Sequence, residues 1–390
     1  MQLNTERLAR LTLAVATLAL AAPGCGGDGE GNGAPDLGTS GNGDLSALPC
    51  SLDLSAVAGD LGHGGGGADA GSGSDGGVVT GVVALPGYDV TVWARGTAAY
   101  YNPDSVASDG THIWVGYQNT TAKDGTDTKT STVVEYTLDG QPLKSWAVPG
   151  HCDGLRIDPA TGLAWASSNE DANPRLVSID PAGTTVTAYS FPSPTAHGGG
   201  FDDMAFVNGG MFITASNPTL NASMVNPFPA IDKVTFNGTN VVLTPVLMGN
   251  AMATDTTTQM MVTLNEVDPD SMTIDPAGEL VLVNQGGSEM VFIKNPGATG
   301  QTVTRLPVGT QLDDTVWATA AKGQLLLADG KSNTIYSVRT HFTPGTVYAE
   351  TPDDSGVNSL LGTLDLTTGN ITPVAIGFKK ATGLLFVADK

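Results

Sequence analysis

The stretch PDSMTIDPAGELVLVNQ at residues 269–285 decides the fold that this sequence predicts. It combines an acidic start, a short apolar strand, a tight turn, a second apolar strand and a polar end. The chain repeats this pattern, so an internal repeat is its first structural feature. Similar two-strand cassettes occur at residues 103–119, 152–171, 201–217 and 312–330, and a degenerate one occurs at 374–390.

Five of these cassettes begin with an aspartate, which we call the lead aspartates: Asp104, Asp153, Asp202, Asp270 and Asp313. Further β-rich pairs follow four cassettes, and each cassette with its pair has the four antiparallel strands of a propeller blade. These pairs lie at 133–138 with 143–148, 176–179 with 186–191, 231–236 with 241–247, and 290–293 with 302–306.

The last cassette ends the chain after only two strands. The β-rich runs at 78–83 and 89–93 are therefore expected to supply its missing outer strands, which would close the ring and remove its exposed sheet edges. The sequence predicts an all-β, six-bladed β-propeller over residues 78–390, closed by N-terminal strands that pair with the C-terminal blade.

Composition agrees with this architecture and excludes one class of partner. The 390 residues include 51 Gly and 23 Pro, which suits many turns and short strands. The formal net charge is −22. Nucleic-acid affinity comes mainly from Lys and Arg on phosphates, so we expect no nucleic-acid partner.

The N-terminus predicts export. Arg7 and Arg10 precede an apolar run at 11–22, too short to span a bilayer, so residues 1–24 are expected to be a signal peptide. Ala22-Pro23-Gly24-Cys25 resembles a lipobox, which would make Cys25 a lipidated membrane anchor. Ordinary secretion with cleavage near 19–21 is the alternative. Either places the chain at the bacterial cell envelope, as an outer-membrane lipoprotein or a periplasmic or extracellular protein.

Residues 25–77 are rich in Gly and Asp and hold few large apolar side chains. Such a segment cannot bury enough surface to offset its ordering entropy, so we expect a disordered tether. Cys50 lies in this tether and Cys152 in the propeller. An oxidising compartment leaves a disulfide between them as an open alternative.

The cassettes resemble those of six-bladed propellers in the NHL-repeat and gluconolactonase/senescence-marker-like superfamily, over roughly residues 78–390. In gluconolactonase-like members, acidic and Asn side chains around the central tunnel hold a catalytic metal. That resemblance implies a comparable site here, with Glu170 and Glu266 as the nearest counterparts of the family's glutamate.

Loop lengths indicate which face carries function. The turns within strand pairs are tight, whereas long loops at 119–130, 217–230, 249–268 and 341–359 share the opposite face. Two polar rings are expected at that long-loop face: the lead aspartates, and the residues that end each cassette, which are Asn119, Asn169, Asn217, Asn284, Asp329 and Asp389.

Carboxylates gathered near one axis repel each other and need hydrogen bonds, raised pKa values or a cation. Oxygen ligands suit calcium. The alternative is structural: each lead aspartate accepts backbone N–H groups from the next blade and fastens the ring. The predicted Ca²⁺ ligands are Asp104, Asp153, Asp202, Asp270, Asp313, Asn169 and Asn284.

His151 and His197 each lie shortly before a lead aspartate and are candidate general bases. The alternative is a hydrogen-bonding loop role. Two functions follow. The chain is a binding module that takes a protein, glycan or small-molecule ligand on its acidic face, or it is a calcium-dependent hydrolase of lactonase or esterase type.

Overall fold

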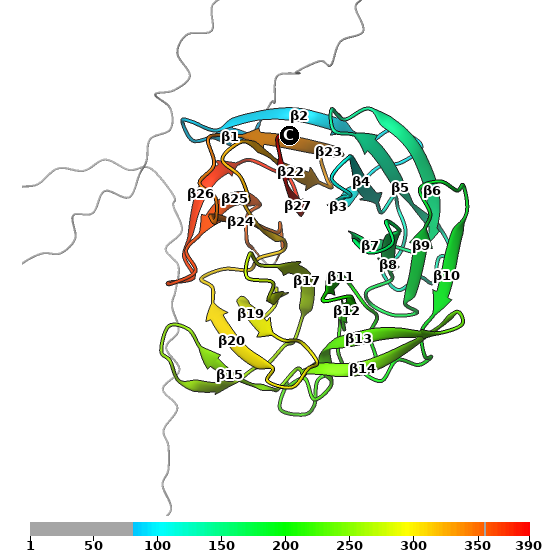
Figure 1. Ribbon diagram of the computed structural model, residues 1–390, viewed down its shortest axis with the longest axis vertical. Helices are drawn as coiled ribbons and strands as arrows, with labels where there is room; N and C mark the ends of the chain where they lie inside the picture. The colour runs from blue at the N-terminus through cyan, green and yellow to red at the C-terminus, as the bar shows by residue number, and fades with distance from the viewer. Residues whose placement is uncertain (1–80, 355) are drawn as a thin grey trace, which may run out of the picture. The chain divides into compact units, whose positions relative to one another are not determined.

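The computed structural model describes residues 81–354 and 356–390, and these residues are all-β, with no helix among them (Figure 1). No membrane-crossing helix was found in this part of the chain. The expected signal peptide, Cys25, the tether and Cys50 lie outside the described residues. Cys152 is buried, and it forms no disulfide within the described residues.

Three consecutive four-stranded antiparallel groups begin the fold, and they follow the predicted cassette-plus-pair pattern. A single parallel pairing, Ser190↔Asn240, merges the second and third groups into one eight-stranded sheet. The groups are β3 (Pro103–Ser108), β4 (His112–Tyr117), β5 (Thr130–Thr137) and β6 (Pro142–Pro149); β7 (Cys152–Ile157), β8 (Ala164–Ser168), β9 (Arg175–Ile179) and β10 (Val186–Ser190); and β11 (Met204–Val207), β12 (Gly210–Thr214), β13 (Pro229–Asn237) and β14 (Asn240–Met248).

The stretch that decided the prediction forms the inner half of the next sheet. Its two strands pair antiparallel across the turn at 275–278, where Asp275 Oδ1 accepts the N–H groups of Ala277 and Glu279. An additional hairpin extends this sheet at its outer edge. The sheet runs β17 (Pro269–Ile274), β18 (Leu280–Asn284), β19 (Glu289–Lys294), β20 (Thr302–Pro307), β15 (Met252–Asp255) and β16 (Met261–Thr263).

The last two sheets exchange strands, which the sequence analysis did not predict. The cassettes at 312–330 and 374–390 were each expected to be a hairpin, but the two strands of each lie in different sheets. One sheet runs β21 (Thr315–Trp317), β24 (Val347–Thr351), β25 (Leu360–Leu364), β26 (Ile371–Ile376) and β1 (Val83–Ala84); the other runs β27 (Ala381–Ala388), β22 (Gly323–Asp329), β23 (Thr334–Arg339) and β2 (Asp89–Arg95).

The N-terminal strands therefore close the fold only partly as expected. Strand β2 pairs with β23 and completes the sheet that holds the last strand, β27, so this sheet joins both ends of the described chain. Strand β1 instead pairs with β26 in the neighbouring sheet, which corrects the expectation that both runs enter the last blade. The innermost strands contact one another in the order β3, β7, β11, β17, β21, β27 and back to β3, around a central axis (Figure 1). This is the arrangement of a β-propeller.

Apolar side chains between neighbouring sheets hold the ring together. One cluster combines Trp114 and Trp146, stacked at 5.1 Å, with Leu155 and Val177 of the next sheet. Strand residues alternate between the two faces, so each sheet presents an apolar layer to both neighbours. The packing leaves the central axis lined by the inner strands.

Candidate functional site

A cavity of about 490 Å³ lies at the end of the ring where the inner strands begin. Each of the four long loops contributes to its wall, so the cavity opens on the face that loop lengths predicted. Its lining holds twelve acidic and four basic residues. The acidic residues are Asp104, Asp153, Glu170, Asp171, Asp202, Asp203, Asp268, Asp270, Asp313, Asp314, Asp353 and Asp354, and the basic ones are Lys123, Arg156, Lys331 and Lys380.

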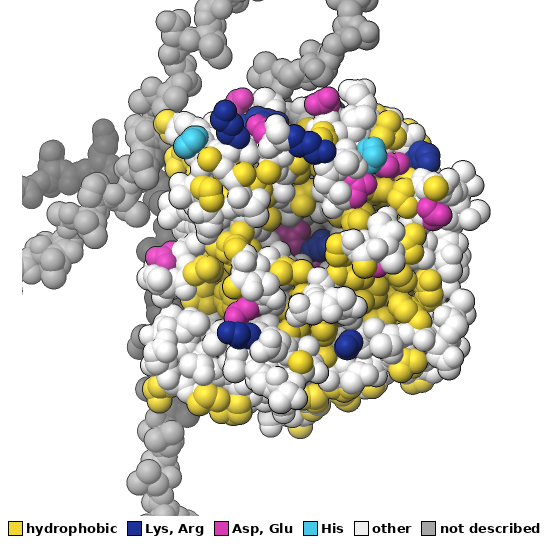
Figure 2. All heavy atoms as spheres, viewed as in Figure 1, with side chains coloured by type: hydrophobic (Ala, Val, Ile, Leu, Met, Phe, Trp, Pro, Cys, Tyr) yellow, Lys and Arg dark blue, Asp and Glu magenta, His cyan; other side chains and the backbone are white. Residues whose placement is uncertain are grey.

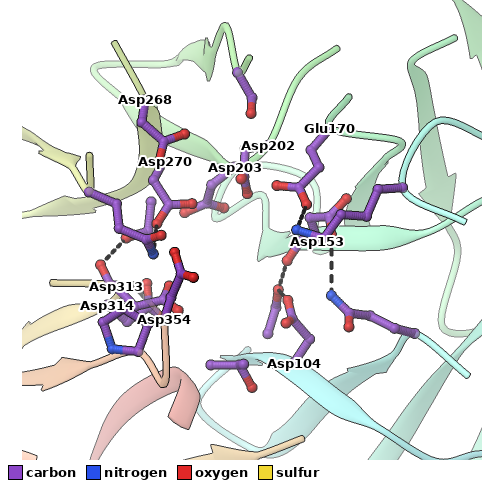
Figure 3. A pocket seen from close by; sticks show the side chains of 18 of the residues that line it. Asp104, Asp153, Glu170, Asp202, Asp203, Asp268, Asp270, Asp313, Asp314 and Asp354 are labelled. Carbon is purple, nitrogen blue, oxygen red and sulfur yellow. Dashed lines mark hydrogen bonds and ion pairs between the residues drawn. The ribbon is translucent and has the colours of Figure 1, made fainter. Parts of the chain in front are cut away.

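The structure brings all five lead aspartates to this cavity, and Figure 3 shows their carboxyl groups around a common space. Asp153 Oδ1 accepts a 3.2 Å hydrogen bond from Gln118 Nε2, and Asp270 Oδ2 accepts one of 3.0 Å from Gln285 Nε2. Within the described residues, no lead aspartate accepts a backbone N–H group, so these side chains do not act as the clamp considered in the sequence analysis.

The residue after two of the lead aspartates performs that clamping role. Asp203 Oδ2 accepts the N–H of Met272 at 2.9 Å, and Asp314 Oδ2 accepts the N–H of Leu384 at 2.9 Å. In each bond the donor lies on the innermost strand of one sheet, and the acceptor lies just before the innermost strand of a neighbouring sheet. The two alternatives left open by the sequence thus apply to adjacent residues: the first aspartate faces the cavity and the second fastens the ring.

Serine hydroxyl groups position the lead aspartates from the preceding sheet. Ser105 donates to the carbonyl oxygen of Asp153, Ser167 to that of Asp202, and Ser271 to that of Asp313. Each bond holds the backbone of a lead aspartate while leaving its carboxyl group free to face the cavity. The Asp-Ser pairs at 104–105 and 270–271 were a visible sequence signal for this arrangement.

Electrostatics in the cavity disfavour negative charge. Burial, followed by repulsion from neighbouring carboxylates, raises the pKa of Asp153, Asp202 and Asp270 well above its usual value. Burial and the adjacent Asp314 raise the pKa of Asp313 to about 8. Asp104 shows the same direction, with burial dominant and Lys380 opposing it. Protonation of these carboxyl groups, or a cation bound between them, would therefore lower the free energy of the folded protein.

Two buried carboxylate oxygens in the lining have no hydrogen-bond partner in the described part of the chain: Asp153 Oδ2 and Asp203 Oδ1. The side chains of both residues are more than nine-tenths buried. A buried, unpaired carboxylate oxygen costs free energy, which a bound cation would offset.

His151 lies directly behind the cavity wall. Its Nδ1 is 2.8 Å from Thr121 Oγ1, and its Nε2 is 3.3 Å from Asp153 Oδ1. Burial lowers the pKa of His151, so the ring is neutral at neutral pH. His151, Asp153 and Glu170 offer ligand atoms within 4.8 Å of one another, so these three residues could hold a metal ion. The Lys123 ion pair, acting against burial, lowers the pKa of Glu170.

Three other predicted site residues, His197, Asn169 and Asn284, do not line the cavity, whereas Asn217 of the second polar ring does. His197 Nε2 contacts the carbonyl oxygen of Gly200 at 2.7 Å, and its ring packs edge-on against Phe201. Asn169 Oδ1 accepts the N–H of His151, and Asn284 is fully buried. Both asparagines shape the loops around the cavity through backbone hydrogen bonds.

Two further expectations need correction. Glu266 is fully buried beside Glu289 and Arg305, away from the cavity. Asp389 was expected on the long-loop face, but it follows an inner strand and its N–H bonds to the carbonyl oxygen of Lys322 at the opposite end of the ring. The strand exchange explains this: the last strand is innermost in its sheet, whereas the prediction placed it second.

Arg156 was not singled out by sequence and lies between two cavities. Its guanidinium pairs with Asp203 and donates a 2.9 Å hydrogen bond to the carbonyl oxygen of Met272. Arg156 lines both the acidic cavity and a second, largely apolar cavity of about 310 Å³ nearer the other end. Figure 2 shows one face hollowed at its centre, where charged side chains lie among hydrophobic ones.

Comparison with known proteins gave only distant structural similarities. Neither the protein-family models nor the curated protein sequences gave a match. Similar solved structures include a protein of unknown function from Bacteroides caccae, with 11% identity over 74% of this chain and 87% of that one, at TM-score 0.44. The periplasmic gluconolactonase of Pseudomonas aeruginosa has 10% identity over 73% and 88%, at TM-score 0.42. Virginiamycin B lyase from Staphylococcus aureus has 13% identity over 65% and 99%, at TM-score 0.40.

Proposed function

We propose that the chain is a six-bladed propeller whose acidic cavity binds a divalent cation and, through it, a ligand on the long-loop face. Taking each four-stranded group as one blade gives the six. The observation that carries the proposal is the set of five lead aspartates around one cavity, with no backbone donor to any of them in the described chain and with raised pKa values.

The donor set favours calcium. The cavity offers carboxylate oxygens from the five lead aspartates, and Ca²⁺ takes six to eight oxygen ligands in flexible geometry. When bound, the ion would neutralise the carboxylates and offer open coordination positions to a ligand oxygen. Lys123, Lys331 and Lys380 line the same cavity and add positive charge for an anionic or polar group of that ligand.

The cavity volume fits a small molecule or one residue of a glycan or protein chain. Arg156 lies between this cavity and the second one, so the ligand would enter and leave from the long-loop face. Export and a lipid anchor at Cys25 remain part of the proposal on the sequence grounds given above. They would place this face outside the cytoplasm, where calcium is plentiful.

A second candidate is a calcium-dependent hydrolase of lactonase or esterase type. The specific observation in its favour is the neutral His151 ring, with Nε2 3.3 Å from Asp153 Oδ1. In that function the cation would polarise a carbonyl group, and Asp153 with His151 behind it would accept a proton from water.

Thermal unfolding of the purified protein, first with chelator and then with excess Ca²⁺, tests the leading proposal. A cation that binds only the folded state stabilises it by about 2.7 kcal/mol at one hundred times its Kd. We expect that rise to disappear when Asp153→Asn and Asp270→Asn are combined. Asp275→Asn is the matched control, because it removes a charge from the same cassette at the turn.

The absence of any shift with Ca²⁺, Mg²⁺ or Mn²⁺ would overturn cation binding. Turnover of lactones or aryl esters that requires both the cation and His151 would favour the hydrolase over the binding module. A calcium-induced shift without turnover would favour the binding module.

A further inference from the structure

A second group of potential metal ligands lies far from the cavity, at the tight turn between β3 and β4. Asp109 belongs to that turn, His112 begins β4, and Glu135 lies on β5, the next strand of the same sheet. His112 Nδ1 is 3.2 Å from Asp109 Oδ2 and 3.4 Å from Glu135 Oε1. All three ligand atoms lie within 4.8 Å of one another.

The turn itself holds Asp109 in place. Its Oδ1 accepts hydrogen bonds from the N–H groups of Thr111 and His112 and from Thr111 Oγ1, at 2.6–2.7 Å. These bonds, acting against partial burial, lower the pKa of Asp109 to about 2, so the carboxylate is ionised at neutral pH. Because Oδ1 makes all of these bonds, Oδ2 is left to face His112 Nδ1.

The buried position of Glu135 supports a metal site independently of these distances. Its residue is only 5% exposed, yet no described residue donates a hydrogen bond to its carboxylate. Among the described residues, its one ion-pair contact is with His112 Nδ1, a member of the same group. The Glu135 side chain is only 7% exposed, and His112 Nδ1, which also lies 3.1 Å from Thr111 Oγ1, stands between its carboxylate and that of Asp109.

We infer that Asp109, His112 and Glu135 form a binding site for a zinc-like transition-metal ion on the tight-turn face. Ligand atoms bound to zinc at about 2.0–2.1 Å in a tetrahedron lie about 3.3 Å apart, which matches both measured separations. One imidazole nitrogen with two carboxylate oxygens suits Zn²⁺ or Co²⁺ better than Ca²⁺, which takes more ligands and prefers oxygen alone.

The site has three protein ligands and room for a fourth from solvent. The side chains of His112 and Asp109 are 38% and 22% exposed, while Glu135 closes the inner side. For Nδ1 to bind the metal, the ring proton must be on Nε2. This arrangement differs from the calcium proposal in donor type and in its place on the ring, so either site can exist without the other.

Titration of the metal-free protein with Co²⁺, followed by its visible absorption, tests the site. Four-coordinate Co²⁺ absorbs more strongly than the six-coordinate aqueous ion, so the spectrum reports geometry as well as binding. The titration uses the Asp153→Asn, Asp270→Asn double variant, in which the cavity is disabled. We expect one equivalent of four-coordinate Co²⁺, displaced by one equivalent of Zn²⁺.

His112→Gln is expected to remove the absorption, and Glu135→Gln to weaken Co²⁺ binding at least tenfold. Asp158→Asn, at the corresponding turn of the next sheet, should leave both unchanged. Retention of the band in His112→Gln, or absence of the band in the parent, would overturn the site. If either variant fails to fold, NMR of the histidine rings in the parent protein tests the site instead. Zinc is expected to shift the signals of one exposed imidazole ring, and unchanged signals would reject the proposal.

Discussion

Asp314 Oδ2 accepts a 2.9 Å hydrogen bond from the backbone N–H of Leu384, in the neighbouring sheet, whereas the adjacent Asp313 faces the cavity and accepts no backbone donor in the described chain. Asp203 and Asp202 divide the same two roles. All four line the cavity, but only the second aspartate of each pair also links two sheets through a backbone hydrogen bond. Substitutions at adjacent positions should therefore have opposite effects.

Asp314→Ala is expected to destabilise the protein, because it leaves the Leu384 N–H buried without an acceptor. Such a loss costs about 1–3 kcal/mol. Asp313→Ala removes a carboxyl group that repels its neighbours, so the metal-free protein should keep or gain stability while its stabilisation by Ca²⁺ falls. Urea unfolding of both variants with and without Ca²⁺ makes the comparison. Equal losses in the two variants would contradict this division of roles.

The stability of the metal-free protein should fall as pH rises from about 4 towards 8. A carboxyl group whose folded-state pKa is raised binds its proton more tightly in the folded state, so its contribution is full below the unfolded pKa and is lost by the folded pKa. Asp313, with a pKa of about 8, sets the upper end of this window. Unfolding at a series of pH values with chelator measures the slope.

Calcium competes with those protons, so its stabilising effect should grow over the same pH range. If the free energy of unfolding of the metal-free protein stayed constant or rose across this pH range, the lead aspartates would ionise without cost to folding. Asp313→Asn should reduce the fall of the unfolding free energy with pH, and Asp275→Asn should not.

Arg156 and Asp203 should be energetically coupled. Their ion pair joins β7 to the residue just before β11, and the Asp203 side chain is only 4% exposed. Arg156→Met leaves Asp203 without its cation, and breaking a largely buried pair in this way costs about 3 kcal/mol. The same substitution in an Asp203→Asn background should cost at least 1 kcal/mol less. A double-mutant cycle by urea unfolding measures the difference, and strictly additive losses would mean that the pair is not coupled.

Repetition of the cassettes allowed the sequence to predict the all-β class, most strand pairs and the face that carries the cavity. Asp104 and Asp270 could be placed because they occupy the same position in similar cassettes. The strand exchange could not be predicted, because the apolar pattern around Trp317 and Leu325 is the same for a hairpin and for two strands in different sheets. Tertiary contacts alone decide between these.

The site was predicted less completely than the fold. Arg156 was missed because a single arginine in a strand carries no local signal, and its role depends on Asp203 and Met272 from other sheets. The asparagines at 169 and 284 share the cassette position of cavity residues, but their side chains turn to backbone groups. The position of a residue in the cassette predicts at which end of the blade it lies. The direction of its side chain depends on the surrounding loops.

Closure of the ring by β2 gives the last prediction. Trp93, on β2, donates a 3.1 Å hydrogen bond from Nε1 to the carbonyl oxygen of Leu138, and its ring lies 5.3 Å from that of Tyr136. It thus connects the sheet of the last strand to the sheet that begins with β3. Trp93→Ala should cost about 3 kcal/mol through lost packing at this junction.

Trp93→Phe is the matched variant, since it keeps most of the packing and removes the hydrogen bond, so it should cost about 1 kcal/mol. Hydrogen exchange adds a spatial readout. If β2 closes the ring, Trp93→Ala should speed exchange in β23, which pairs with β2, and in β27, at the other edge of the same sheet, more than in β13 and β14 across the ring. Equal acceleration everywhere, or a loss below 0.5 kcal/mol by urea unfolding, would mean that β2 is not the closing strand.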